Sequence, residues 1–353
     1  MLGTVKIGKK EIGKGHRVFI VAEMSANHGG SLEGALRILR EAKACGADAV
    51  KLQTYTADSL TLNSGKPDFK INDDSPWSQH QTLYDLFQKA AMPMHWHEPL
   101  FREAKNLELE IFSSPFDPKA VDLLEDLGSV AYKIASPEVT DVILLERVGR
   151  TGKPVIVSTG VAELTDIDFA VNTLRNAGCK DIILLKCSAS YPAPPESIHL
   201  RTIPHMAEIF QCVTGLSDHT LGIGVPVAAV ALGASMIEKH FVVDRENAID
   251  GFFSLTPAEF KQMVDEVRKV ELALGRVNYS LDDDVKKDFR GRRSLYVSST
   301  IQPGDPISHE NVRAVRPAFG MPARYLKKVI GKKALRSMDL GDRLTFGDLD
   351  WSE

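Results

Sequence analysis

Hydrophobic and polar positions follow a repeating pattern along the first three quarters of the chain. Short apolar runs that end in polar residues alternate with stretches of helical periodicity. The runs predict strands at residues 17–23, 49–54, 110–113, 131–135, 154–158, 181–187, 213–217 and 235–240. The helical stretches are 32–45, 93–106, 118–127, 141–151, 166–177, 202–209, 225–232 and 257–274. This alternation favours a parallel (β/α)8 TIM barrel over an open doubly wound sheet, because no Gly-x-Gly-x-x-Gly turn follows any strand.

Three segments do not fit the alternation. Residues 5–15 predict a small hairpin that closes the barrel floor, and the polar loop 57–82 predicts a lid over the opposite end. The barrel domain is expected over 1–280, a charged linker over 281–289 and a separate small domain over 290–353. Within that small domain, the segment that begins at Ile301 resembles the one that begins at Met338, so two similar turn-and-strand units are expected to fold on each other.

Composition narrows the class of protein. The 353 residues are 43% hydrophobic, which is enough for one large core and a smaller one. The formal net charge of −4 argues against nucleic acid as a partner. No apolar run approaches the roughly 20 residues that span a membrane, and the N-terminus lacks a signal-peptide core, so a cytoplasmic protein is expected. The four cysteines form no Cys-x-x-Cys pair, and no catalytic role is expected for them.

Two histidines follow neighbouring predicted strands. His219 comes after the strand at 213–217, and His240 ends the strand at 235–240. Parallel strands lie about 4.8 Å apart and end at one rim, so both imidazoles could bind a single cation. Carboxylates lie nearby at Asp218 and at Glu238, the latter on the same strand face as His240. The alternative is a pair of core histidines that are hydrogen-bonded to the backbone.

The other strand ends are also polar. They carry Glu23, Lys51, Gln53, Ser114, Lys133, Ser136, Glu138, Ser158, Lys186, Ser188 and Ser217. Three lysines and a ring of hydroxyls at one mouth suit a small dianion or trianion, such as a phosphate ester that also carries a carboxylate. Serines at strand ends can instead cap the following helices, but that explanation does not cover lysines inside strands, where a charge needs a partner.

Several strings of residues resemble the sialic-acid synthase family. They are AEMSANHGG, KLQTYTADSLT, SSPFD, YKIASPEVTD, VSTGVAE, SASYPAP, GLSDHTLGI and IEKHF. The resemblance covers nearly the whole chain and implies an enzyme that condenses phosphoenolpyruvate with an N-acetylated sugar. Within the family, KLQTYT, YKIAS and IDGFFSLTP are most similar to the branch whose acceptor is a 6-deoxy hexose with two acetamido groups. A sugar of the N-acetylmannosamine type is the alternative acceptor.

The resemblance implies a role for each matched position. It implies that a divalent ion, Mn²⁺ or else Mg²⁺ or Co²⁺, binds to His219 and His240, and that Glu23 is the acid/base residue. It implies phosphoenolpyruvate binding by Lys51, Ser114, Lys133, Ser136, Ser158 and Ser217. It implies sugar binding by Gln53, Glu138, Tyr191 and Asp250. One position departs from the family, because Ala189 stands where an asparagine contacts phosphoenolpyruvate, so that contact is either missing or supplied by Ser188.

The tail resembles the antifreeze-like (SAF) domain that ends sialic-acid synthases. Arg316 matches the arginine that reaches into the barrel of the other subunit in that family, which implies a domain-swapped homodimer that also contributes Arg316 to the sugar site. A domain of about 60 residues has a marginal core alone, so docking on a second chain is physically reasonable. Ice binding is the poorer alternative, because the tail is rich in Arg, Lys and Asp.

Other readings of these residues remain open. A Schiff-base aldolase would also place a lysine on a barrel strand, with Lys133 or Lys186 as the amine. A non-catalytic carbohydrate-binding protein would need neither the lysines nor the histidine pair. Phe252 and Phe253 follow Asp250 and suit an acceptor that carries a methyl group, although both rings could simply be core residues under the loop.

Overall fold

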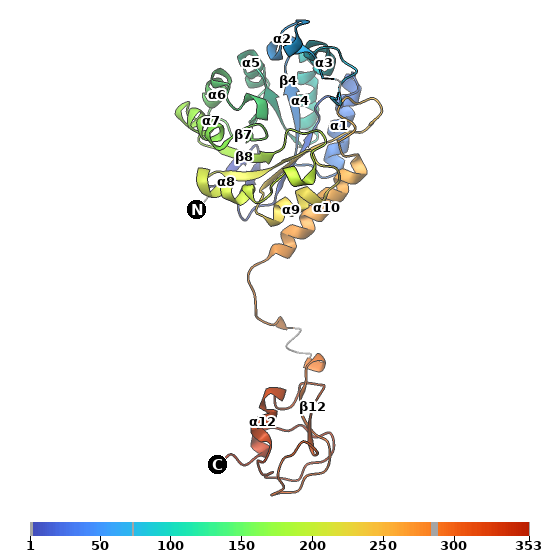
Figure 1. Ribbon diagram of the computed structural model, residues 1–353, viewed down its shortest axis with the longest axis vertical. Coiled ribbons are helices and arrows are strands. Elements are labelled where there is room, and N and C mark those ends of the chain that lie inside the picture. Colours follow the sequence, from blue (N-terminus) through green and yellow to red (C-terminus); the bar gives the residue numbers. More distant parts are fainter. Residues whose placement is uncertain (1–2, 73, 284–288, 353) are drawn as a thin grey trace. The chain divides into compact units, whose positions relative to one another are not determined.

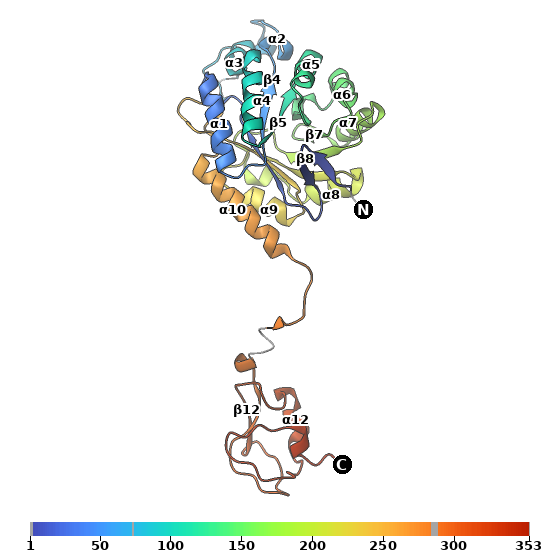
Figure 2. The ribbon, with the colours of Figure 1, turned by 180° about the vertical axis from the view of Figure 1, so that it is seen from behind.

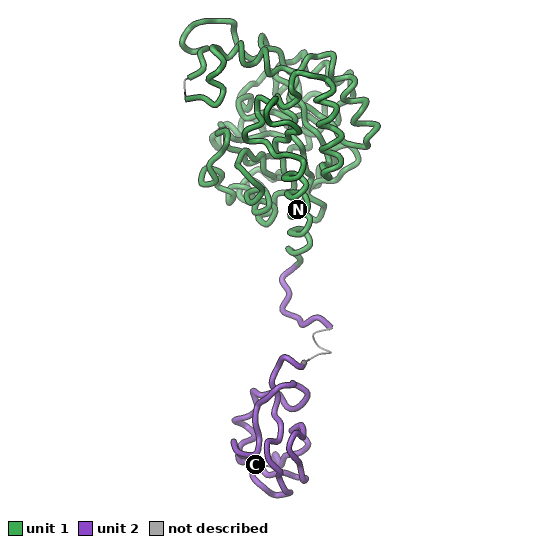
Figure 3. Tube along the Cα trace, turned by 90° about the vertical axis from the view of Figure 1, so that its right-hand side faces the viewer, with its two compact units in different colours: residues 1–275 green, residues 276–353 purple. Residues whose placement is uncertain are grey.

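The structure, a computed structural model, describes residues 3–72, 74–283 and 289–352. It divides into two compact units, residues 1–275 and 276–353 (Figure 3). The linker predicted at 281–289 includes residues 284–288, which lie outside the described residues. Each unit has its own hydrophobic core.

The first unit is a closed barrel of parallel strands, in the order β10-β3-β4-β5-β6-β7-β8-β9 (Figure 1). The strands are β3 (Phe19–Glu23), β4 (Ala49–Thr54), β5 (Glu110–Pro115), β6 (Tyr132–Ile134), β7 (Val155–Ser158), β8 (Ile182–Cys187), β9 (Val213–Asp218) and β10 (Met236–His240). All eight lie where the apolar runs predicted strands. The TIM-barrel prediction is therefore confirmed.

Helices cover the outside of the barrel (Figures 1 and 2). They are α1 (Leu32–Ala44), α4 (His97–Asn106), α5 (Pro118–Asp126), α6 (Val142–Gly149), α7 (Leu164–Asn176), α8 (Thr202–Phe210), α9 (Gly224–Ala231) and α10 (Pro257–Leu274). Side chains cap several of their N-termini, as Ser31 does for α1 and Thr256 for α10. The helix predicted at 93–106 begins later, at His97, because residues 94–96 form a 3-10 turn.

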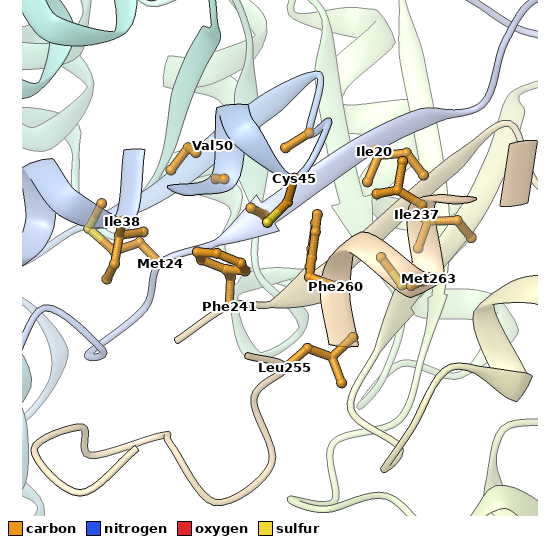
Figure 4. Close-up of a cluster of buried hydrophobic side chains, with 14 of the residues drawn as sticks. Ile20, Met24, Ile38, Cys45, Val50, Ile237, Phe241, Leu255, Phe260 and Met263 are labelled. Carbon is orange, nitrogen blue, oxygen red and sulfur yellow. The ribbon is translucent and has the colours of Figure 1, made fainter. Parts of the chain in front are cut away.

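The strands bury their alternate side chains against these helices. Figure 4 shows Ile20 of β3, Ile237 of β10 and Phe260 of α10 in one buried cluster. Phe241 packs edge to face on Phe260, with ring centroids 5.1 Å apart. This cluster fixes β3, β4 and β10 against α1, α9 and α10, so the strand ends that carry Glu23 and His240 rest on a rigid base.

The barrel floor is closed by the predicted hairpin. Its strands are β1 (Val5–Ile7) and β2 (Lys10–Ile12), which pair antiparallel. The hairpin's three buried side chains share a cluster with the inward-facing residues at the start of the barrel strands, among them Phe19 and Phe112. This end of the barrel is therefore filled with apolar side chains.

The long segment between β4 and α4 contains helices that the sequence pattern did not predict. They are α2 (Ala57–Leu60) and α3 (Leu83–Ala90), with a 3-10 turn at Pro67–Phe69 between them. Both α2 and α3 are too short for a clear apolar period. Thr56 and Thr82 cap them with hydroxyl groups that accept backbone N–H bonds. Among the described residues, no helix is long and apolar enough to cross a membrane.

The second unit contains a short antiparallel pair, β11 (Ser294–Val297) and β12 (Val312–Val315), and the helical turn α12 (Leu326–Val329). The predicted internal repeat is confirmed by equivalent hydrogen bonds. The carboxylate of Asp305 accepts the amide of Gln302 (2.8 Å), and that of Asp342 accepts the amide of Asp339 (2.9 Å). The two copies pair with each other through an antiparallel bridge between Ile301 and Met338.

Candidate active site

A cavity of about 680 Å³ opens at the C-terminal ends of the barrel strands. Its lining contains most of the predicted site residues, namely Lys51, Gln53, Lys133, Ser136, Glu138, Ser158, Tyr191, Ser217, His219, His240 and Asp250. Glu23 and Ser114 are fully buried next to the cavity, and each contacts Lys51. Arg316 is exposed on the second unit. The strand ends therefore gather thirteen of the fourteen predicted residues at one place.

An ionic network links three neighbouring strands at the base of the cavity. The Lys51 ammonium lies 3.0 Å from Glu23 Oε2 and 3.3 Å from Glu238 Oε1. It also donates a hydrogen bond to Ser114 Oγ (3.3 Å). Ser217 Oγ donates to Glu238 Oε1 (3.2 Å). The strand register explains the network, because Lys51 pairs with Glu23 across β3 and β4, while Glu238 pairs with Ser217 across β9 and β10.

Burial and neighbouring charges shift the pKa values of the two carboxyl groups that flank Lys51 in opposite directions. Burial raises the pKa of Glu23 to about 7, with a further increase from Glu238, although Lys51 opposes it. Burial also acts against ionisation of Glu238, but Lys133 and Lys51 outweigh it and lower the Glu238 pKa. Glu23 can therefore exchange a proton near neutral pH, while Glu238 stays ionised.

The rings of the two histidines are neighbours in the lining of the cavity, with centroids 5.1 Å apart. His219 Nδ1 lies 2.7 Å from the carbonyl oxygen of Ser188, which can only accept, so Nδ1 carries the proton and Nε2 holds the lone pair. His240 is buried and its Nδ1 has no hydrogen-bond partner among the described residues. Burial and then the neighbouring His219 hold the His240 pKa well below its usual range. Burial opposes protonation of His219, but Cys187, the Ser188 carbonyl and Asp218 outweigh it and raise the His219 pKa. His240 is therefore held in the neutral form that a metal ligand requires, whereas a cation at His219 would compete with a proton for Nε2.

No group of three or more His, Cys, Asp or Glu side chains is arranged to hold a metal in the part of the chain that the structure describes. A cation bound by His219 and His240 would take its other ligands from water or substrate. That arrangement is the open coordination sphere of a catalytic metal site rather than the closed sphere of a structural one.

A second group of polar side chains lies on the β6 and β7 side of the cavity. Lys133 is almost fully buried and donates to the carbonyl of Ile134 (3.2 Å). Burial lowers its pKa, and Glu238 acts in the opposite direction. Ser136 Oγ accepts the amide of Gly160 (2.8 Å), and Ser158 Oγ is buried without a partner among the described residues. An anion held here would gain a cation and hydroxyl donors in a desolvated site.

A third group lies near the mouth. Gln53 Nε2 donates to Glu23 Oε1 (2.9 Å) and to Ser25 Oγ (3.1 Å). Ser25 Oγ in turn donates to Asp250 Oδ2 (2.6 Å). Burial raises the pKa of Asp250, while that of Glu138 is raised to about 7, also chiefly by burial. These amide and carboxyl groups offer both donors and acceptors to a polyhydroxylated ligand.

Residues 38–279 match the NeuB family, and residues 292–350 match the SAF domain. The chain belongs to the NeuB family. It is 44% identical to a pseudaminic acid synthase of Campylobacter jejuni, over 94% of this chain and 96% of that protein. It is 41% identical to a pseudaminic acid synthase of Helicobacter pylori, over 94% of this chain and 98% of that protein.

Other relatives are more distant. An N,N'-diacetyllegionaminic acid synthase of Campylobacter jejuni is 33% identical, over 91% of this chain and 97% of that protein. The crystal structure of a spore coat polysaccharide biosynthesis protein of Bacillus subtilis superposes with a TM-score of 0.68 at 33% identity, and covers 99% of this chain and 100% of that chain. The family, the barrel and the SAF domain that the sequence resemblance implied are therefore confirmed.

The NeuB-family cavity also contains residues that sequence reasoning did not identify. Ser25 lines it in a left-handed backbone conformation (φ 44°) that non-glycine residues rarely adopt. The strand alternation could have indicated Ser25, which lies two residues after Glu23. Trp77 comes from the predicted lid, and its ring contacts that of Tyr191 at 5.7 Å. No local pattern marks a loop tryptophan as a cavity residue.

The aromatic pair that follows Asp250 divides between two environments. Phe253 is 2% exposed, lines the cavity and lies 4.6 Å from the His240 ring. Phe252 is 44% exposed and packs on Trp77 instead (6.0 Å between centroids). Only Phe253 is therefore positioned to present a phenyl ring to a ligand beside Asp250.

Three predicted strand-end residues point away from the cavity. Lys186 lies between Leu185 and Cys187, which face inward, so it faces the helices, where it donates to the carbonyl of Cys187 (2.8 Å). The prediction that it converges on the mouth, and its candidacy as a Schiff-base lysine, are wrong. Asp218 also turns outward, to Lys239. Ser188 Oγ is hydrogen-bonded to Ser197 Oγ (3.1 Å) and does not line the cavity, which does not favour Ser188 as the substitute for the contact in doubt at Ala189.

Proposed function

We propose that this chain is a pseudaminic acid synthase, which condenses phosphoenolpyruvate with 2,4-diacetamido-2,4,6-trideoxy-L-altrose and water to give pseudaminic acid and phosphate. The observation that supports the reaction is the gathering of two buried lysines and two neighbouring imidazoles in one cavity. The lysines suit the phosphate and carboxylate of one substrate, and the imidazoles suit a metal beside the aldehyde of the other. The identities of 44% and 41% to pseudaminic acid synthases support the acceptor.

A divalent ion, Mn²⁺ or else Mg²⁺ or Co²⁺, would be held by Nε2 of His219 and by His240. When bound, it would supply Lewis-acid polarisation of the aldehyde oxygen. The fit rests on the free lone pair of His219 and on the unpartnered ring nitrogen of His240 among the described residues. The carboxylate of Glu238, two residues before His240 on the same strand face, would help to balance the added charge.

Phosphoenolpyruvate would lie over β4 to β9. Its phosphate and carboxylate oxygens would accept hydrogen bonds from Lys51, Lys133 and the hydroxyls of Ser114, Ser136, Ser158 and Ser217. Lys51 already lies between Glu23 and Glu238, so the incoming anion would exchange one of these contacts for a contact to substrate. This arrangement would hold carbon 3 of phosphoenolpyruvate near the acceptor aldehyde and exclude bulk water.

The proton transfers fall to Glu23. Carbon 3 forms a bond to the aldehyde carbon, whose oxygen becomes an alkoxide and takes one proton. Water adds at the electron-poor carbon 2 and loses one proton, which balances the proton taken by the alkoxide. The resulting tetrahedral centre then expels phosphate by cleavage of its carbon–oxygen bond, and its hydroxyl proton passes to the departing phosphate to leave the ketone. The pKa of about 7 lets Glu23 give a proton in one step and recover it in another. Gln53, hydrogen-bonded to Glu23, fixes the orientation of the carboxyl group.

The acceptor would lie between Gln53, Glu138, Tyr191 and Asp250, with its 6-methyl group on Phe253. Burying a methyl group contributes about 0.8 kcal/mol, and an unpaired hydroxyl in an apolar pocket costs a further ~1–3 kcal/mol. Preference for the 6-deoxy sugar over N-acetylmannosamine should therefore be roughly 10- to 1000-fold.

A phosphate-release assay with Mn²⁺ and phosphoenolpyruvate tests both parts of this proposal. The 6-deoxy diacetamido sugar should be turned over with the higher kcat/KM. A clear preference for N-acetylmannosamine would contradict the proposed acceptor and leave the proposed condensation reaction intact.

Lys133, with its lowered pKa, is also the kind of lysine that Schiff-base aldolases use. Borohydride with pyruvate should leave the protein unlabelled, since covalent labelling of Lys133 would indicate the aldolase.

The second unit would complete the site of another copy of the chain. Arg316 follows β12 and is exposed, as a residue that reaches a partner's barrel must be. In a domain-swapped homodimer of cytoplasmic enzyme, a mixture of Arg316→Ala chains and Glu23→Ala chains should regain activity, because one of the two sites in a mixed dimer would be intact. If mixed dimers form and remain inactive, the swapped arrangement is wrong.

A further inference from the structure

A buried ion pair lies on the helix side of β9 and β10, directly behind the two histidines. The Lys239 ammonium is 2.5 Å from Asp218 Oδ2, and both side chains are 0% exposed. Side chains alternate along a strand, so the neighbours of these residues, His219 and His240, point to the opposite side and line the cavity. The nearest helix-facing side chains of these strands, Leu216 and Ile237, are apolar and belong to the core.

The ion pair holds the backbone on both sides of His219. Asp218 Oδ1 accepts the backbone amide of Thr220 (3.1 Å) and its hydroxyl (2.9 Å). The Lys239 ammonium also donates to the carbonyl oxygen of Thr220. One cation on β10 therefore fixes the residue before His219 and the residue after it, and it immediately precedes His240 in the chain.

The sheet by itself does not hold His219. The ladder between β9 and β10 ends with the pair Asp218 and Lys239, so His219 is one residue beyond the last paired position. Besides the ion pair, the loop is held by the bond from His219 Nδ1 to Ser188 and by the amide of Ala193, which donates to the His219 carbonyl (2.9 Å). Fixing His219 relative to His240 across the strand pair requires a contact that joins β9 to β10, which the ion pair provides.

A buried ion pair is a poor source of stability. Desolvation of the two charges offsets most of their attraction, and a well-packed apolar pair of similar size often serves stability as well or better. Apolar side chains fill the core around this position. The pair therefore contributes a fixed geometry, through the directional bonds that Asp218 and Lys239 make to Thr220.

We infer that Asp218, Lys239 and Thr220 form a positioning clamp that sets the separation of the His219 and His240 imidazoles, and thereby the affinity of the site for its divalent cation. These are positioning residues, since none of the three lines the cavity. The inference rests on the proposed metal role of the histidines. It predicts that loss of the clamp weakens metal binding in the resting enzyme, before either substrate is present.

The test is the full-length double variant Asp218→Asn/Lys239→Met, which removes both charges together and so avoids an unpaired buried charge. Mn²⁺ binding is measured by calorimetric titration without substrates, beside the thermal midpoint and the phosphate-release rate. The matched control is Asp48→Asn/Arg268→Met, which removes a part-buried ion pair (3.1 Å) at the other end of the barrel. We expect the clamp variant to bind Mn²⁺ at least 10-fold more weakly, and the control to bind it as the wild type does.

Wild-type affinity for Mn²⁺ in the folded clamp variant overturns the inference and leaves the proposed function intact. A wild-type chain that binds no Mn²⁺ overturns the metal role of the histidines and this inference with it. If the double variant does not fold, Thr220→Val and Thr220→Ser decide. Thr220→Val removes only the hydroxyl donor and should weaken Mn²⁺ binding several-fold, and Thr220→Ser should restore it. Equal binding by Thr220→Val and wild type contradicts the clamp.

Discussion

The two ends of the barrel are built from the same strands but enclose different kinds of side chain. Inward-facing positions begin apolar at the floor and end polar at the mouth. On β4, Ala49 joins the floor cluster while Lys51 lines the cavity. On β10, Met236 joins the floor and His240 lines the cavity, four residues later. The floor gains stability from burial, and the mouth holds buried charges at a cost in stability.

This difference between floor and mouth predicts which substitutions should affect folding and which should affect catalysis. The floor cluster consists of apolar side chains, among them those of the β1–β2 hairpin. A residue at the mouth, two to four positions further along the same strand, contacts other charges. Substitutions at the mouth should therefore lower activity more than stability, and substitutions at the floor should lower stability more than activity.

The largest effect is expected at the histidine pair. His219→Ala or His240→Ala should lower kcat/KM by about 10³-fold or more, because each removes one of the two proposed protein ligands of the Lewis-acid site. The thermal midpoint should stay within a few degrees of the wild type. Phosphate release and circular dichroism measure the two quantities. Chelator should abolish wild-type activity and Mn²⁺ should restore it, and full activity in excess chelator would contradict the metal site.

At the floor, Phe112→Ala should cost about 3–5 kcal/mol of folding free energy, because a fully buried ring leaves a cavity. Denaturant unfolding measures this loss. KM for both substrates, corrected for the folded fraction, should not change. Phe112→Leu is the milder control and should recover most of the stability. A raised KM in the folded fraction of Phe112→Ala would show that the two ends are coupled.

Lys133→Met exchanges a buried charge at the mouth for an apolar side chain. Loss of hydrogen bonds to a charged group, worth ~1.5–3 kcal/mol, should lower kcat/KM for phosphoenolpyruvate by about 10- to 150-fold. Burial lowers the Lys133 pKa, so the charged form is disfavoured in the folded state and its removal should leave the melting temperature unchanged or higher. If Lys133→Met instead lowers the melting temperature and leaves the KM for phosphoenolpyruvate unchanged, Lys133 stabilises the fold and does not bind this substrate.

The smallest effect concerns Glu138. Burial raises its pKa from 4.5 to about 7, so the folded state favours the protonated form. Its stabilising contribution is complete below pH 4.5 and is lost as pH rises through 7. Glu138→Gln, which stays neutral, should gain roughly 1–3 kcal/mol relative to the wild type between pH 5 and pH 8. Urea unfolding at both pH values measures the change, and an equal difference at the two values would show that Glu138 stays ionised.

Strand positions could be predicted because each strand is a short apolar run between turn signals, and the barrel followed from their regular alternation with helices. The His219 and His240 pairing could also be predicted, since adjacent parallel strands must end at one rim. The short helices α2 and α3 could not, because they contain too few residues to show a period. The direction of Lys186 was misjudged, since a lysine inside an apolar run does not by itself reveal which side it faces.

Patterns in the sequence were enough to predict the barrel, its plugged floor, the repeat in the second unit and the strand ends that meet in the cavity. These follow from periodicity and turn chemistry, which act between residues close in the chain. Only the tertiary structure decided that Glu23 and Glu238 share Lys51, that Trp77 and Phe253 line the cavity, and that Asp218 and Lys239 pair behind the histidines. Such contacts join residues that are distant in sequence, and packing and desolvation, which no local pattern encodes, select them.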